Sequence, residues 1–164
     1  MTDKLLYILA GYDDETSARL ESIQNRLYEC GFTGTHTKNI PLHITLGFYP
    51  TGKEKEAELA DFIRTLAART SPFEITFNSV SIFDNARVLF IAPDTNEKLI
   101  HLKENFGDSH NWTAHTTMII DEPDVILKAV PIVLDEFSAF SGRITSLHLY
   151  EFFPTRHILS VDFK

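Results

Sequence analysis

The order of strand-like and helix-like segments repeats along this chain, and that repeat restricts the possible folds more than any other feature. Each series reads strand, helix, strand, helix, strand, because apolar residues alternate in some segments and recur at helical spacing in others. The first series is predicted at residues 4–12, 13–31, 42–48, 52–70 and 73–83. The second is predicted at residues 87–93, 95–107, 115–120, 122–140 and 144–152, with one further strand at 156–163. A duplicated order of this kind predicts a fold built from two similar units.

The repeat indicates an α+β protein of two pseudo-symmetric lobes. We expect each lobe to be a mostly antiparallel sheet with helices packed outside, and the two sheets to face each other across a central cleft. No linker separates the two series, so residues 1–164 are predicted as a single bilobal domain with approximate halves 1–84 and 85–164. Pro131 lies inside the last helical run and is expected to kink or split it.

Each series carries one polar pair inside an otherwise apolar strand. His43 and Thr45 form the first pair, and His115 and Thr117 form the second, 115 − 43 = 72 residues later. Side chains at i and i+2 share one face of a strand, so each histidine points the same way as its threonine. Two facing lobes would bring both pairs to the central cleft. We therefore expect a site there with two imidazoles and two hydroxyls.

Such a set of groups suits the cleavage of a phosphodiester. A neutral histidine takes the proton from the attacking water or hydroxyl, and a protonated histidine gives one to the leaving oxygen. Histidine fits both roles because its ordinary pKa of about 6.5 lets both forms exist near neutrality. Threonine hydroxyls can donate to the phosphate oxygens without adding charge. This chemistry requires no metal.

Other interpretations of the histidines stay open. A strand histidine beside a hydroxyl is commonly a satisfied polar group at a sheet edge. Two histidines joined by Asp or Glu could also bind zinc, although the usual ligand spacings are missing. The remaining histidines show no such pairing and are interpreted as surface or packing residues: His36, His101, His110, His148 and His157.

Charge and composition restrict the partners. Fifteen Lys and Arg against 23 Asp and Glu give a net charge of −8, which repels long polyanions and favours a small phosphorylated ligand or the end of a nucleic acid. The basic candidates are scattered at Lys38, Arg87, Arg143 and Arg156. No signal peptide or membrane-spanning stretch is recognisable, and there is one cysteine, so we expect a cytoplasmic monomer.

Aromatic residues near the two pairs are candidates for stacking on a base, although packing roles are the stronger interpretation. They are Tyr12, Phe48, Tyr49, Phe83 and Trp112. Phe48 in particular is expected inside, because it shares strand parity with the apolar Ile44 and Leu46.

The chain resembles the 2H phosphoesterase superfamily, in particular its bacterial 2′-5′ RNA ligase-like branch. "HITL" at His43 and "HTTM" at His115 match that family's His-x-(Thr/Ser)-x signature, and the order of segments agrees along the whole chain. The resemblance implies metal-independent opening of a 2′,3′-cyclic phosphate or related small cyclic phosphodiester, leaving a 2′-phosphate, with no cofactor. It implies that His43 and His115 are the acid–base pair and that Thr45 and Thr117 hold the phosphate.

The same resemblance leaves alternatives. Some members of the family join RNA ends through 2′-5′ bonds, so an RNA ligase or RNA-end processing enzyme is one of them. A non-catalytic nucleotide-binding module is another. Which histidine is the acid and which is the base does not follow from the sequence.

Overall fold

The computed structural model describes residues 4–34 and 36–164 and shows an α+β fold there, as the sequence predicts. Its strands are β1 (Leu5–Tyr12), β2 (His43–Pro50), β3 (Phe73–Ile82), β4 (Val88–Pro93), β5 (Thr116–Ile120), β6 (Phe140–Phe152) and β7 (Arg156–Asp162). Its helices are α1 (Asp14–Glu29), α2 (Lys53–Ala68), α3 (Glu97–Glu104) and α4 (Pro123–Glu136). None of the helices in the described ranges is both long and apolar enough to cross a membrane.

One antiparallel sheet runs through the molecule in the order β2-β1-β6-β3-β4-β5, and β7 also pairs with β6. The long strand β6 connects two groups of strands. Its first residues, Phe140–Ile144, pair with β3, whereas Ile144–Phe152 pair with β1. The two groups of strands therefore belong to different lobes but share one hydrogen-bonded strand.

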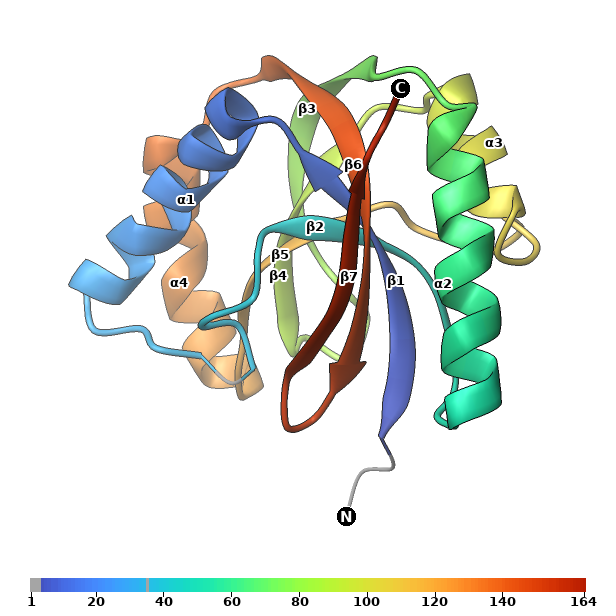
Figure 1. Cartoon of the computed structure of the whole chain (residues 1–164). Helices are drawn as coiled ribbons and strands as arrows, with labels where there is room; N and C mark the ends of the chain where they lie inside the picture. Colours follow the sequence, from blue (N-terminus) through green and yellow to red (C-terminus); the bar gives the residue numbers. More distant parts are fainter. Residues whose placement is uncertain (1–3, 35) are drawn as a thin grey trace.

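The fold has two lobes, with the helices at the two sides of the strands (Figure 1). Helices α1 and α4 pack on each other and on the strands β4, β5 and the start of β6. Helices α2 and α3 contact β2, β6 and β7 on the other side. Each lobe therefore contains helices from early and late in the chain, and the turn near residue 84 joins the paired strands β3 and β4.

Local chemistry accounts for both ends of α1, whereas Pro131 does not end α4. The side chain of Asp13 caps α1 by accepting from the Thr16 N–H at 2.9 Å, and Gly31 follows the helix with φ 93°. Pro131 lies inside α4, which continues unbroken to Glu136, so the expected split does not occur. The carbonyl that loses its partner belongs to the exposed Leu127, where water can replace the missing N–H.

The expected alternation of buried and cleft-facing residues is present at the start of β2. Ile44 and Leu46 have no exposed surface and pack in the core, while His43 and Thr45 between them are partly exposed. This alternation places the first polar pair on the opposite face from the core.

The prediction that Phe48 lies inside is wrong. In the pairing of β1 with β2, Ile8 faces Gly47 but Leu9 faces Thr45, so Leu46 is an extra residue in a bulge. One extra residue reverses the inward and outward parity of everything after it. Phe48 consequently lies opposite Tyr7 and is 63% exposed.

Candidate functional site

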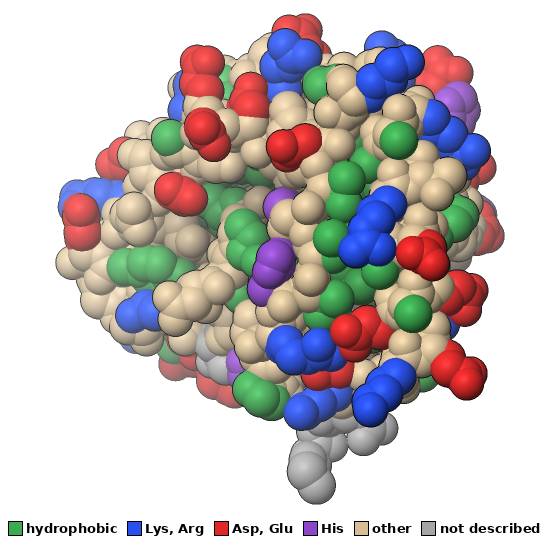
Figure 2. All heavy atoms as spheres, in the orientation of Figure 1, with side chains coloured by type: hydrophobic (Ala, Val, Ile, Leu, Met, Phe, Trp, Pro, Cys, Tyr) green, Lys and Arg blue, Asp and Glu red, His purple; other side chains and the backbone are tan. Residues whose placement is uncertain are grey.

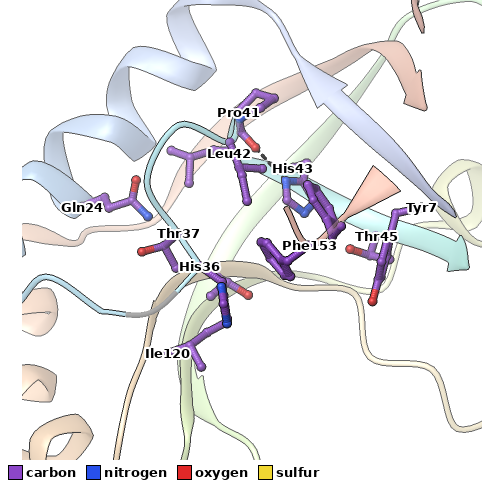
Figure 3. A pocket seen from close by; sticks show the side chains of 13 residues that line it. Tyr7, Gln24, His36, Thr37, Pro41, Leu42, His43, Thr45, Ile120 and Phe153 are labelled. Atoms are coloured by element: carbon purple, nitrogen blue, oxygen red, sulfur yellow. Dashed lines mark hydrogen bonds between the residues drawn. The ribbon is translucent and has the colours of Figure 1, made fainter. Parts of the chain in front are cut away.

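The backbone fixes the orientation of the first histidine. His43 begins β2, and its Nδ1 lies 2.6 Å from the carbonyl oxygen of Pro41 (Figure 3). A carbonyl oxygen only accepts, so Nδ1 carries the proton and donates it, which leaves the Nε2 lone pair free. The pKa of His43 is lowered to about 4, mainly by burial; the Pro41 hydrogen bond opposes this decrease, and the positive charges of His115 and His148 add to it.

The second histidine repeats this geometry. His115 directly precedes β5, and its Nδ1 donates to the carbonyl oxygen of Thr113 at 2.8 Å. Its ring lies against two aromatic rings, with centroid distances of 4.8 Å to Phe83 and 5.2 Å to Phe90. Burial lowers the pKa of His115. Both histidines thus use the carbonyl two residues before them and keep Nε2 free.

The two motif strands are joined directly, although they lie at the two ends of the strand order. The Thr116 hydroxyl donates to the carbonyl oxygen of His43 at 3.0 Å and accepts from the hydroxyl of Tyr12. The Trp112 indole N–H donates to the carbonyl oxygen of Thr45 at 3.2 Å. The sheet therefore curves enough to bring β2 and β5 together, and the strand of one histidine motif is tied to the strand of the other.

A cavity of about 200 Å³ opens beside this junction, and His43, Thr45 and Thr117 line it. His115 is not part of its lining, but its charge acts on His43. The structure therefore brings three of the four predicted site residues to one cavity and places the fourth within electrostatic reach.

Aromatic and apolar side chains form most of the remaining wall of the cavity. The ring of His36 stacks on Phe153 with a centroid distance of 4.0 Å, and Tyr7 lines the opposite side (Figure 3). Among the described residues that line the cavity, histidine is the only type that can carry charge at neutral pH. Figure 2 shows histidine side chains near the middle of this face, close to apolar side chains. The cavity suits a small ligand that combines a phosphate with a flat ring.

The predicted basic residues lie outside this cavity. Arg87 pairs with Glu122 at 2.8 Å, and Arg156 pairs with Glu56 at 2.7 Å and with Glu151. The other two are Lys38, which lies over the ring of Tyr28, and Arg143, which lines a separate depression. The positive strip that a long RNA needs is absent from the described lining of the cavity.

Most of the aromatic residues named as candidates for base stacking have packing roles instead. Tyr12 is buried, and Trp112 is bound to the backbone of β2 as described above. Tyr49 lies under the ammonium group of Lys55 on the side of α2. Phe83 contacts His115, so its role is to surround that histidine.

One residue beside the site differs from its sequence-based interpretation. The local pattern indicates only a surface or packing role for His148 on β6, yet its charge acts on His43. His148 lies on β6, which is separated from β2 by β1. Only the order of strands in the sheet places it near His43, so no local sequence pattern could have revealed this. In the described ranges, 4–34 and 36–164, no three His, Cys, Asp or Glu side chains group as metal ligands.

Solved structures share this fold. The chain is similar to Escherichia coli LigT complexed with phosphate (15% identity, 99% of each chain covered, TM-score 0.65) and to LigT complexed with 3′-AMP (14% identity, 99% of each chain, TM-score 0.66). It is also similar to the protein TT0787 of Thermus thermophilus, with 14% identity over 96% of this chain and 97% of that chain and a TM-score of 0.59. At these identities the likeness shows the fold alone.

The family of this chain follows from comparison of its sequence with known proteins and protein families. A search among curated proteins found no match. The profile of the 2′-5′ RNA ligase superfamily matches residues 12–152, which is most of the chain. The resemblance to LigT-like 2H phosphoesterases is thereby confirmed, and the chain belongs to the 2′-5′ RNA ligase superfamily.

Proposed function

We propose that this protein is a metal-independent phosphodiesterase that opens a 2′,3′-cyclic phosphate, or a related small cyclic phosphodiester, and leaves a 2′-phosphate. The observation that carries the proposal is the matched pair of histidines. Each donates from Nδ1 to the backbone carbonyl two residues earlier and keeps Nε2 free, on two strands that are joined by the Thr116 hydrogen bond. A neutral imidazole of this kind can accept a proton at Nε2, and the other imidazole can donate one from Nε2 when it is protonated.

The reaction needs one neutral and one protonated histidine. Water attacks phosphorus while the neutral imidazole takes one of its protons, and the bond from phosphorus to the 3′ oxygen breaks as the protonated imidazole gives a proton to that oxygen. Phosphorus therefore gains one oxygen bond and loses another. The two histidines exchange protonation states and are reset by exchange with solvent.

Thr45 and Thr117 are assigned to the phosphate. Both line the same cavity as His43, and their hydroxyls can donate to the non-bridging oxygens. Neutral donors suit a small monoanionic diester, which does not need the strong positive field that a polyanion requires. The complexes of LigT with phosphate and with 3′-AMP support ligands of this class.

The cavity and the charge also favour a small substrate over a long RNA. A volume of about 200 Å³ holds a phosphate and part of a nucleoside, and the net charge of −8 disfavours a polyanion.

The decisive experiment measures hydrolysis of the four 2′,3′-cyclic nucleoside monophosphates in EDTA, with the product isomer identified by phosphorus NMR. His43→Gln and His115→Gln should each lower kcat/KM by about 10²-fold or more. His101→Gln is the matched control, because His101 is exposed on α3 and paired only with Glu97. Folded protein without turnover on any of the four substrates would contradict the proposal, and so would full activity in either site variant.

Ligation of RNA ends is the second candidate, and the superfamily name favours it. It predicts joining of a 2′,3′-cyclic phosphate end to a 5′-hydroxyl end, with rates that fall steeply as salt increases. Joined product at rates that exceed cyclic nucleotide hydrolysis would make this the principal activity.

A further inference from the structure

A third histidine shares the sheet face of His43. Antiparallel partners lie on the same face, and Gly11 of β1 pairs with His43 of β2 on one side and with Ser146 of β6 on the other. Two residues further along β6, His148 pairs with Leu9. The face that carries His43 therefore continues across β1 to His148.

Gly11 makes room for the ring of His148. A Cβ atom at Gly11 would clash with both Nε2 of His148 and Oγ of Ser146, so any other residue at this position would displace these side chains. Neighbouring strands are about 4.8 Å apart, and Gly11 is the direct partner of His43. The imidazole of His148 thus lies over Gly11, the residue of β1 that stands between this ring and the strand of His43.

A chain of hydrogen bonds holds this ring in place. His148 Nε2 lies 3.2 Å from Ser146 Oγ, and its Nδ1 lies 2.6 Å from Ser160 Oγ on β7. The same Ser160 oxygen lies 2.7 Å from Nε2 of His157. Ser160 has a single hydroxyl proton, so it donates to one ring and accepts from the other. Both nitrogens of His148 are therefore occupied by neutral partners.

We propose that His148 is a positioning residue that opposes protonation of His43 as the pH falls below neutrality, so that His43 is the proton acceptor of the reaction and His115 the proton donor. The inference rests on the proposed hydrolysis for its catalytic part. His148 does not need to touch substrate in this role. It acts as a potential positive charge beside His43, and a second positive charge there is unfavourable in a partly buried site.

The surroundings of the two reacting histidines support this assignment. Burial lowers the pKa of His43 most, to about 4, and His115 across the joined strands and His148 along the sheet lower it as well. Burial also lowers the pKa of His115, whose ring packs against Phe83 and Phe90, but no value as low as that of His43 results. A single proton shared by the pair therefore favours His115.

The groups around His148 keep it mostly neutral near pH 7. Burial and the charge of His157 lower its pKa, and the carboxylate of Asp162 on β7 opposes them. Tyr150 lies near its ring on β6, with a centroid distance of 6.3 Å. As the pH falls, His148 and His43 compete for protons, so a proton on one disfavours a proton on the other.

The test replaces His148 by Gln, which keeps polar contacts toward Ser146 and Ser160 but cannot be charged. In NMR titrations of the imidazole protons, the midpoint of His43 should rise by about 0.5 to 1 pH unit. The acidic limb of the kcat/KM profile should move up by the same amount, because protonation of the acceptor causes that limb. The basic limb, which follows the donor His115, should stay in place.

Two controls define the result. His101→Gln should leave both the His43 titration and the rate profile unchanged, since the His101 side chain is exposed on α3 and does not line the cavity. Gly11→Ala should also move the His43 midpoint, because its Cβ displaces the ring of His148. Folding of each variant is checked by far-UV circular dichroism.

A substrate with sulfur in place of the leaving oxygen tests the assignment of the two roles. A thiolate leaves without being protonated, so the donor becomes dispensable. His115→Gln should recover at least about tenfold of its lost activity on this substrate, whereas His43→Gln should recover none.

Three results would overturn the inference: an unmoved His43 midpoint in folded His148→Gln, a shift of the basic limb instead of the acidic limb, or recovery of His43→Gln by the sulfur substrate. The titration needs no substrate, so it separates this inference from the proposed function. If no cyclic phosphate is turned over and the His43 midpoint still moves, the proposed function fails while the action of His148 on His43 stands.

Discussion

The two histidine strands share their local geometry and differ in their neighbours. In both, Nδ1 donates to the carbonyl two residues earlier, so the backbone sets the same tautomer twice. The strand of His43 adjoins Gly11 and the polar chain around His148, whereas His115 lies among aromatic rings. The similar backbone therefore orients two imidazoles in the same way, and in our proposal the unequal side chains around them decide which imidazole carries the proton.

The largest expected effect comes from breaking the contact between the two strands. Thr116→Val removes the hydroxyl that binds the carbonyl oxygen of His43 and accepts from Tyr12 in a fully buried position. It should lower the free energy of unfolding by about 1–3 kcal/mol, because it leaves buried polar groups without partners. Urea denaturation measures this loss.

The neighbouring Thr117 is the matched control, since it is only partly buried and lines the cavity. Thr117→Val should lower kcat/KM by about tenfold and change the free energy of unfolding by less than about 0.5 kcal/mol. Equal losses of stability in the two variants would show that Thr116 does not connect the lobes.

A smaller expected effect, on the pH dependence of stability, tests the difference between the pKa values of His43 and His115. The pKa of His43 is lowered to about 4 in the folded protein, so the unfolded chain binds a proton below pH 6.5 that the folded protein resists. The contribution of His43 to stability is therefore complete above about pH 6.5 and is lost as the pH falls toward 4, with a total of about 1–2 kcal/mol.

This stability loss is measured by urea denaturation between about pH 4 and pH 7.5. His43→Gln should flatten the dependence of the free energy of unfolding on pH, and His115→Gln should flatten it less. An unchanged slope in His43→Gln would refute the lowered pKa.

The smallest expected effect on stability concerns the side chains of β2 before and after its bulge. Ile44→Val, before the bulge, should cost about 0.5–1.5 kcal/mol because the side chain is fully buried. Phe48→Ser, after the bulge, should cost less than about 0.5 kcal/mol because the ring is mostly exposed. A large loss for Phe48→Ser in thermal denaturation would mean that the bulge does not reverse the strand.

Features with a local cause were predictable from the sequence. The apolar alternation around His43 depends on residues within a few positions, and the structure agrees with it. The repeated order of segments likewise predicted two lobes with one histidine strand in each.

Features set by pairing between distant strands were not predictable. The bulge at Leu46 depends on the register with β1, and the start of β6 at Phe140 depends on its partner Phe77 in β3. The apolar spacing alone predicts a helix as far as residue 140. The place of His148 beside His43 needs the order β2-β1-β6, which joins the beginning and end of the chain.

The shared strand β6 has a mechanical consequence. Because its thirteen residues pair with strands of both lobes, the lobes cannot swing apart without bending β6 and breaking the bond from Thr116 to His43. The distance between the two imidazoles is then held by a rigid set of hydrogen-bonded strands. We expect such an arrangement to favour ligands that fit the existing gap between the imidazoles without a closing motion.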